Sequence, residues 1–414
     1  MLKRIPVSDV RMGMYIARFE GSWLNHPFWR ARFLLADEHR LRAVRNSRVK
    51  FVLIDVSKGS DVDPVALPLR MPDAPEEPSR VARRGQTWTA APAIAVSMNG
   101  TPFLQRTHVE RVAAFGKARS IAQKAESELA AMIMEMKLGA ILNVRKVAGV
   151  VDDIFASVER DAFAFTGLMR CKQGAPNIYR HSLAVSGLMI AFARKLGHSA
   201  PEVRIAGQAG LLMDVGHAYL GPGSRSEDHT TLGYEALSGA QGLAHSVLDV
   251  CLRHHERLDG SGFPAGLKGE AIDQLSRMAA ICDAFTEMSE TDGEMQLSDP
   301  VAAVAHLAAH PEQFCPELVT RFVEVVGRYP VGSFVALRTG RLAMVVFGDT
   351  EGSDLPTVRT FYNLATGKRL RGENIDMRNC YGSDEIIGAY DVSSLDAGTI
   401  STLRERILNA ALKQ

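Results

Sequence analysis

The sequence predicts a mainly α-helical protein, in which a helical bundle lies between a small N-terminal β-rich or α+β module and a C-terminal β-hairpin module. Three observations support this prediction. Apolar residues recur at helical spacings of three and four through the middle of the chain, short alternating strand patterns occur on either side, and a proline-rich stretch follows the first module. The 414 residues, 46% hydrophobic and 23% charged, suffice for two or three folded domains.

The N-terminal module is expected to span residues 1–56. Its segments VRMGMYIARF (residues 10–19) and KFVLIDV (residues 50–56) have the composition of strands. Residues 57–105 are rich in proline and have few periodic apolar positions. We therefore expect a mostly extended linker there.

Two long helices are expected in residues 106–170, because apolar side chains recur at helical spacing with no proline between them. The first ends near Gly139 and the second runs from about Val144 to Arg170. They suit a connector, a homodimer contact through residues 107–170, or simple packing on the next domain. Residues 171–327 then continue with five or more shorter helices.

The C-terminal extension, residues 328–414, changes pattern after Tyr329-Pro330-Val331-Gly332. SFVALRTGRLAMVVFGD forms two strand patterns around Thr339-Gly340, which indicates a hairpin. TVRTFYNLATGKRL adds a third strand with another turn, and a short helix is expected between Ser394 and Lys413.

Composition excludes several classes of protein. The 48 basic and 47 acidic residues balance, so no global field attracts nucleic acid or an anionic membrane. The five cysteines form no CxxC pair, which argues against a zinc ribbon or a disulfide framework and suits a reducing compartment. Neither a secretory signal nor a membrane-spanning apolar stretch is present in the sequence, so we expect a cytoplasmic protein.

Histidines crowd into one region, where seven of the twelve fall between His181 and His255. Imidazoles and carboxylates are the ligands of zinc, iron or manganese, although each histidine alone could be structural or exposed. The most specific string is HHERLDGSGFP, residues 254–264, which on composition alone could also be an ordinary helix end followed by a turn. The candidate metal ligands are His181, Asp214, His229, His254, His255 and Asp283.

Over about residues 177–290 the sequence resembles the HD-GYP family, a branch of the HD metal-dependent phosphohydrolases. The family string HHExxDGxGYP stands here with Phe263 in place of its tyrosine. RHSLAVSGLMIAFARKLG resembles the first ligand helix, GLLMDVGHA takes the place of LLHDIGK, HTTLGYEAL resembles HPxxGxxxL, and AAICDAFTEM resembles the last ligand helix. The first 60 residues resemble, more weakly, the small module that often precedes such domains.

The resemblance implies an HD-type helical bundle that hydrolyses the bacterial second messenger cyclic di-GMP to pGpG or GMP. Two or three ions of iron, manganese or a similar divalent metal would activate water and neutralise phosphate charge. By analogy with the family, one ion is held by His181, Asp214, Asp283 and the histidine of the HD pair. The other is held by Asp214, which bridges the two, together with His229, His254 and His255.

The sequence departs from the family at this chemical centre. The HD histidine is Met213, whose thioether is a poor ligand for such ions, and the lysine three residues after Asp214 is His217. The acidic ligand of three-metal members is Asn177, and the segment between His217 and His229 is shorter, which should open or reshape the pocket. We therefore expect one well-formed metal site and one weakened or empty site. His217 could fill the gap if the helix continued past Met213.

The GSGFP turn bears on partners, because the resemblance implies that this loop contacts other signalling proteins, notably diguanylate cyclases. Phenylalanine keeps the ring of tyrosine but loses its hydroxyl, so stacking could survive. Cations flanking the loop could meet a phosphate or could be solvated surface charges. The candidate ligand- or partner-binding residues are Arg253, Arg257, Gly260, Gly262, Phe263, Pro264 and Lys268.

Three functions are compatible with these residues. The favoured one is a cyclic di-GMP signalling protein of weak or absent phosphodiesterase activity, because Met213 and His217 replace catalytic groups. The second is an active metal-dependent phosphodiesterase with a modified site, in which Asp214 and His217 are catalytic. The third is a non-catalytic interaction module with relic histidines, against which the intact Asp214, His229, His254 and His255 argue.

Overall fold

The structure is a computed structural model that describes residues 2–20, 33–35, 41, 44–45, 51–60, 107–172, 178–221, 223–290, 299–348, 355–380, 384–392 and 400–413. Two compact units divide the chain, Met1–Gln105 and Arg106–Gln414, and each is described by itself. None of the helices in the described ranges is long and apolar enough to cross a membrane.

The N-terminal unit contains an antiparallel sheet of strand order β1-β4-β2-β3. The strand expected over residues 10–19 begins only at Tyr15, because a turn comes first in which Gly13 has a φ of 82°. Of the expected linker, residues 57–60 form a turn and the rest lies outside the described residues. The strands are β1 (Leu2–Pro6), β2 (Tyr15–Glu20), β3 (Phe33–Leu34) and β4 (Phe51–Asp55).

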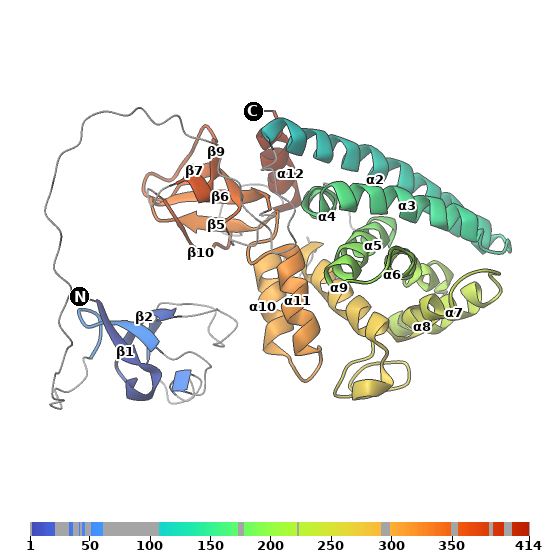
Figure 1. Cartoon of the computed structure of the whole chain (residues 1–414), viewed down its shortest axis with the longest axis horizontal. Helices are drawn as coiled ribbons and strands as arrows, with labels where there is room; N and C mark the ends of the chain where they lie inside the picture. Colours follow the sequence, from blue (N-terminus) through green and yellow to red (C-terminus); the bar gives the residue numbers. More distant parts are fainter. Residues whose placement is uncertain are drawn as a thin grey trace, which may run out of the picture. The chain divides into compact units, whose positions relative to one another are not determined.

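Two helical segments open the second unit. Helix α2 (His108–Lys137) begins with a capping box between Thr107 and Glu110, and α3 (Val144–Arg160) begins at Asn143, whose side chain accepts two backbone N–H bonds. They lie side by side (Figure 1) and α2 also packs on α4 and α5. Packing on the next domain, one of the three expectations, is therefore observed, whereas the homodimer stays a prediction.

The single second helix expected up to Arg170 is wrong, because it breaks at Asp161. That residue has an extended backbone, and its carboxylate accepts the backbone N–H of Ala164 to begin α4 (Ala162–Cys171). The break turns the chain so that α4 packs on α2, α3 and α5.

The bundle continues with α5 to α11, and α5 packs on α6, α9 and α11. Its core is apolar, with Phe165, Phe192, Phe285 and Phe322 fully buried. The elements are α5 (Ile178–Lys195), α6 (Ala200–Leu212), η3 (Val215–Tyr219), η4 (Ser226–Asp228), α7 (His229–Ser238), α8 (His245–Arg253), η5 (Gly269–Ala271), α9 (Gln274–Glu290), α10 (Pro300–Ala309) and α11 (Pro316–Val326).

The C-terminal extension is larger than the expected hairpin and third strand. It is a six-stranded antiparallel sheet of order β10-β5-β6-β7-β8, in which β9 also pairs with β7. The expected final helix is α12 (Ile400–Ala411). The strands are β5 (Phe334–Leu337), β6 (Arg341–Phe347), β7 (Thr357–Asn363), β8 (Lys368–Arg369), β9 (Asn374–Asp376) and β10 (Ile386–Ala389).

Two buried arginines join this extension to the bundle. Arg170 of α4 donates to the carbonyl of Val331 at 2.7 Å. Arg404 of α12 donates to the carbonyl of Gly332 at 2.9 Å and to that of Ser289, near the end of α9, at 3.0 Å. Buried donors with carbonyl partners fix the relative position of these elements, since losing a partner would leave a charge unsatisfied.

Candidate metal centre

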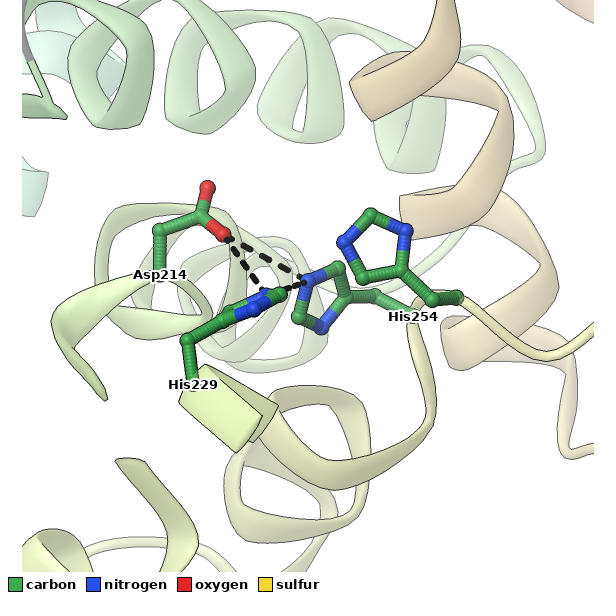
Figure 2. Close-up of side chains that lie close together, drawn as sticks. Asp214, His229 and His254 are labelled. Atoms are coloured by element: carbon green, nitrogen blue, oxygen red, sulfur yellow. Dashed lines mark hydrogen bonds and ion pairs between the residues drawn. The ribbon is translucent and has the colours of Figure 1, made fainter. Parts of the chain in front are cut away.

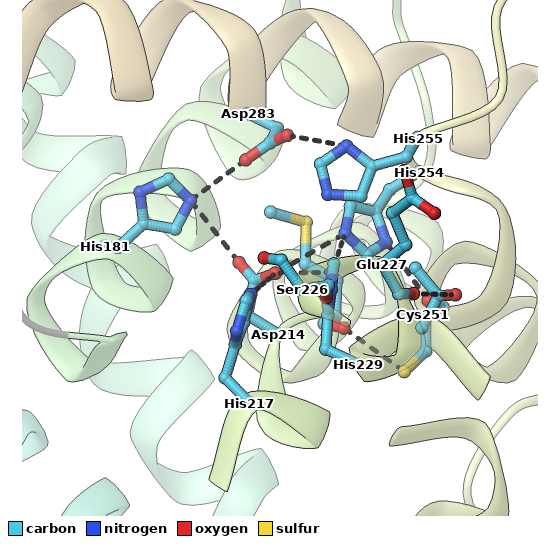
Figure 3. Close-up of polar contacts among 12 residues, drawn as sticks. His181, Asp214, His217, Ser226, Glu227, His229, Cys251, His254, His255 and Asp283 are labelled. Carbon is cyan, nitrogen blue, oxygen red and sulfur yellow. Dashed lines mark hydrogen bonds and ion pairs between the residues drawn. The ribbon is translucent and has the colours of Figure 1, made fainter. Parts of the chain in front are cut away.

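Five structural elements bring the expected ligands together. His181 lies on the first turn of α5, Asp214 directly follows the end of α6, and Asp283 lies on α9. His229 begins α7, whereas His254 and His255 directly follow the end of α8. All six side chains meet in one polar cluster inside the bundle (Figure 3).

A close backbone contact holds Asp214 against His229. The short helix η3 packs directly on the start of α7, and a Cβ on Gly216 would lie 1.8 Å from the backbone oxygen of His229. Only glycine permits this approach. The glycine at this place is therefore needed to form the site.

The first group of ligands gathers around Oδ1 of Asp214. That oxygen lies 3.6 Å from Nε2 of His229 and 3.4 Å from Nε2 of His254, and the two nitrogens are 3.2 Å apart (Figure 2). One ligand atom each from these residues and from His255 lies within 4.8 Å of the others. We call Asp214, His229, His254 and His255 the imidazole-rich set.

The second group uses the other oxygen of the same carboxylate. Nε2 of His181 lies 3.4 Å from Oδ2 of Asp214 and 3.0 Å from Oδ1 of Asp283 (Figure 3). We call His181, Asp214 and Asp283 the carboxylate-rich set. Asp214 therefore bridges two neighbouring groups of potential metal ligands, with one oxygen directed to each.

Hydrogen bonds to the outer ring nitrogens fix two of the imidazoles. Nδ1 of His229 lies 2.6 Å from the carbonyl of Ser226, and Nδ1 of His254 lies 3.1 Å from the carbonyls of Val250 and Cys251. Nδ1 must carry the proton to donate to a carbonyl, so each neutral ring presents a lone pair on Nε2. Two lone pairs that face each other beside a carboxylate favour a shared cation.

The buried carboxylates carry unsatisfied oxygens as well. Among the described residues, Oδ2 of Asp214 and Oδ2 of Asp283 are buried without a hydrogen-bond donor. Such atoms are costly unless a proton or a cation compensates them. The donor set therefore fits a divalent metal ion.

The protonation states agree with ligand chemistry. Burial, together with the charge of His254, lowers the pKa of His255 to about 3, and burial lowers the pKa of His229 to about 4. Burial would raise the pKa of Asp214, but its interaction with His254 lowers the pKa overall. At neutral pH His229 and His255 are therefore neutral imidazoles beside a carboxylate, the forms that bind metals. Burial would lower the pKa of His254, but its interaction with Asp214 raises the pKa overall, so His254 releases a proton when its Nε2 binds a metal ion.

His217 lies on the imidazole-rich side of Asp214. Its ring stacks on His229 at 4.0 Å, and its Nε2 lies 3.8 Å from Oδ1 of Asp214. The idea that it continues the helix past Met213 is wrong, because α6 ends at Leu212 and the 3₁₀ helix η3 follows. Burial lowers the pKa of His217, which favours a neutral ring where the family has lysine.

The loop after His255 closes over the cluster. The ring of Phe263 stacks on His255 at 4.6 Å and meets His229 edge-on at 6.4 Å. Glu256, buried, accepts the backbone N–H groups of Ala265 and Leu267 at 2.8 and 2.9 Å, which ties the loop back. The stacking surface expected to face a partner therefore faces the site.

Glycines shape this loop. A Cβ on Gly262 would lie 2.3 Å from the carbonyl oxygen of His255, and Gly260 has a φ of 81°. Gly260 also packs under the aliphatic stem of Lys268, whose side chain is exposed. Pro264 is exposed as well.

The two candidate arginines differ in place. Arg257 donates to the carbonyls of His254 and Glu256 and lies over the ring of Phe314, 5.0 Å from its centroid. Burial lowers the pKa of Arg257. Arg253 instead pairs with Asp249 at 3.2 Å on the surface of α8, so only Arg257 lies against the residues of the site.

Comparisons with known proteins identify the family of this chain. The family described as HD domain matches residues 171–317, and a domain of unknown function, DUF3391, matches residues 2–147. The cyclic di-GMP phosphodiesterase PA4108 of Pseudomonas aeruginosa is 34% identical over 96% of this chain and 95% of its own length. The chain belongs to the HD-GYP family.

Two further comparisons cover less of the chain or are more distant in sequence. The cyclic di-GMP phosphodiesterase response regulator RpfG of Xanthomonas campestris is 40% identical over 30% of this chain and 36% of its own length. The solved HDG"Y"P protein Bd1817 of Bdellovibrio bacteriovorus covers 78% of this chain and 98% of its own, at 16% identity and a TM-score of 0.43.

The domain matches bear on the expected organisation of this HD-GYP protein. A module before the HD domain is confirmed as DUF3391, and its match extends beyond the expected boundary at residue 56 through α2 into α3. Asn177, the position of the third-metal ligand, lies outside the described residues.

Two acidic residues beside this site were not among the candidates predicted from the sequence. Glu256 stood in the quoted motif without a role, although it anchors the loop. Glu287 follows Asp283 by four residues on α9, a spacing that places both on one helix face. The charge of Asp283 and burial raise the pKa of Glu287 to about 7.

Proposed function

We propose that this HD-GYP protein binds cyclic di-GMP and a divalent cation and hydrolyses the dinucleotide weakly or not at all. The observation that carries the proposal is the contrast between two adjoining ligand sets. The imidazole-rich set offers four ligand residues, whereas the carboxylate-rich set offers three. PA4108, similar over nearly the whole chain, is named a cyclic di-GMP phosphodiesterase, which supports the choice of ligand.

The imidazole-rich set is the proposed tight metal site. His229 and His254 direct Nε2 towards it, and Asp214 shares its carboxylate with the neighbouring set. A divalent cation such as iron or manganese, when bound, supplies charge for the phosphate and acidifies water. The hydrogen bonds from Nδ1 to backbone carbonyls orient both rings for this role.

The carboxylate-rich set is the proposed reason for weak activity. Met213, in the place of the HD histidine, is fully buried and brings a soft thioether that hard or borderline ions disfavour. His217 replaces a permanently charged lysine by a ring that is mostly neutral at neutral pH. Both changes weaken the binding of the scissile phosphate.

Partner binding remains part of the proposal. Ser261 and Pro264 are exposed on the loop, so they, rather than Phe263, would meet another signalling protein such as a diguanylate cyclase. A homodimer through residues 107–170 remains a prediction, for which the apolar side chains of Met134, Leu138 and Ile141 are exposed near the turn between α2 and α3.

Chromatography of the products tests this function. Full-length protein is incubated with cyclic di-GMP and Mn²⁺, beside Met213→His and Asp214→Asn variants, and binding is measured by calorimetry. We expect binding by the wild type, little or no pGpG, and at least tenfold more product from Met213→His. Rapid hydrolysis by the wild type would support the fully active alternative, and no binding at all would support the interaction module.

A further inference from the structure

Helix α9 carries a second carboxylate on the same face as Asp283. Glu287 lies four residues further along, one helical turn or about 5.4 Å. Side chains at this spacing are neighbours, and a glutamate has three rotatable bonds before its oxygens. Its carboxylate can therefore be directed back along the helix towards Asp283.

Charge interactions associate Glu287 with the carboxylate-rich set. The charge of Asp283, burial and the charge of Asp214 raise the pKa of Glu287, whereas the charge of His181 lowers it, so its carboxylate lies within electrostatic range of all three members of that set. Glu287 is nonetheless partly exposed to solvent, so it lies at the rim of the site. The crowding of a third negative group against two carboxylates is unfavourable without a cation.

A second, independent observation indicates that the carboxylate-rich set lacks a positive charge. Oδ2 of Asp214 and Oδ2 of Asp283 are both buried without a hydrogen-bond donor among the described residues, and both side chains are more than nine-tenths buried. Nε2 of His181 lies between the two carboxylates. The carboxylate-rich set thus has the negative charge to bind a cation, but it has one ligand residue fewer than the imidazole-rich set.

We propose that Glu287 provides the missing ligand for a cation held by His181, Asp214 and Asp283, in compensation for Met213. This inference rests on the proposed function, since it concerns the weaker of the two proposed sites. Three carboxylates and one imidazole form an oxygen-rich site, which selects hard ions such as Mn²⁺ or Mg²⁺. Occupancy of this site, and any hydrolysis that needs it, then depends on the supply of such an ion.

Titration with Mn²⁺ alone tests the assignment. Full-length protein is stripped with chelator and titrated by calorimetry, with free Mn²⁺ followed by electron paramagnetic resonance. We expect the wild type to bind one ion tightly and a second more weakly. Glu287→Gln should weaken the second at least tenfold and leave the first unchanged. Glu235→Gln, a neutralised exposed glutamate on α7, should bind both like the wild type.

A second variant protects the test against a general loss of structure. Adding Met213→His to Glu287→Gln should restore the second ion, since it returns a ligand to the same set. An unchanged second ion in Glu287→Gln, with the first still tight, would overturn this inference alone. If the wild type binds no Mn²⁺ at all, the metal site of the proposed function is wrong as well as this inference.

Discussion

Glu256 allows a sharp test of how the loop over the site is held. Its carboxylate is 1% exposed and accepts the backbone N–H groups of Ala265 and Leu267 at 2.8 and 2.9 Å. Glu256→Gln preserves the shape of the side chain but replaces one accepting oxygen by an NH₂ group. That group meets a backbone N–H, so one hydrogen bond is lost and a buried donor is left unpaired.

The expected cost follows from these contacts. A hydrogen bond to a charged group contributes about 1.5–3 kcal/mol, and an unsatisfied buried donor costs about 1–3 kcal/mol. Because the two figures partly count the same loss, they do not simply add, and we expect the free energy of unfolding to fall by about 2–4 kcal/mol. The stack of Phe263 on His255 depends on the same loop, so the affinity for Mn²⁺ should fall as well.

Urea denaturation followed by circular dichroism measures the loss, and calorimetry measures Mn²⁺ affinity. The matched control is Glu270→Gln, which removes a surface ion pair with Arg277 and should leave the free energy of unfolding close to that of the wild type, because an exposed pair is screened by water. A change below about 0.5 kcal/mol in Glu256→Gln, with unaltered Mn²⁺ affinity, would refute the proposed anchoring role.

Three other substitutions probe separate parts of the fold. Gly216→Ala places a Cβ 1.8 Å from the backbone oxygen of His229, so the free energy of unfolding, measured by thermal denaturation, should fall by about 3 kcal/mol and Mn²⁺ binding should weaken. Wild-type stability and wild-type Mn²⁺ affinity in this variant would contradict the close packing of Gly216 on His229. Arg404→Met leaves two buried carbonyls unpaired and should cost about 3 kcal/mol in urea; a cost below about 1 kcal/mol would show that Arg404 does not hold the C-terminal extension. Burial raises the pKa of Asp299 to about 6, so between about pH 4 and pH 6 the native state binds a proton that the unfolded chain has released, and stability falls as the pH rises. Asp299→Asn should remove roughly 2–3 kcal/mol of that fall. If the stability of the variant and of the wild type changes equally with pH, the raised pKa of Asp299 is wrong.

The sequence allowed the ligand set to be anticipated because its motifs are local. The helices of the bundle follow from strong periodicity, and the family resemblance placed His181, Asp214 and Asp283 on three of their segments. The structure then brings those segments together, with Asp214 between the two sets.

Features that depend on distant contacts could not be predicted in this way. The break at Asp161 rests on one capping bond, which the apolar pattern of the surrounding helix obscures. Strands β8 and β9 are only two and three residues long, too short for an alternating pattern, and pairing with β7 decides them. Glu256 acts through residues nine and eleven positions away, so its role depends on the folded loop.

The metal content of protein purified without chelator tests the central claim most directly. Elemental analysis of the wild type should find about one iron, manganese or similar divalent ion per chain, because the imidazole-rich set holds it without added metal. His254→Ala, which removes an imidazole 3.4 Å from Asp214, should lose that ion while keeping its helical circular dichroism. A wild type without metal, or a His254→Ala variant that retains it, would contradict the account.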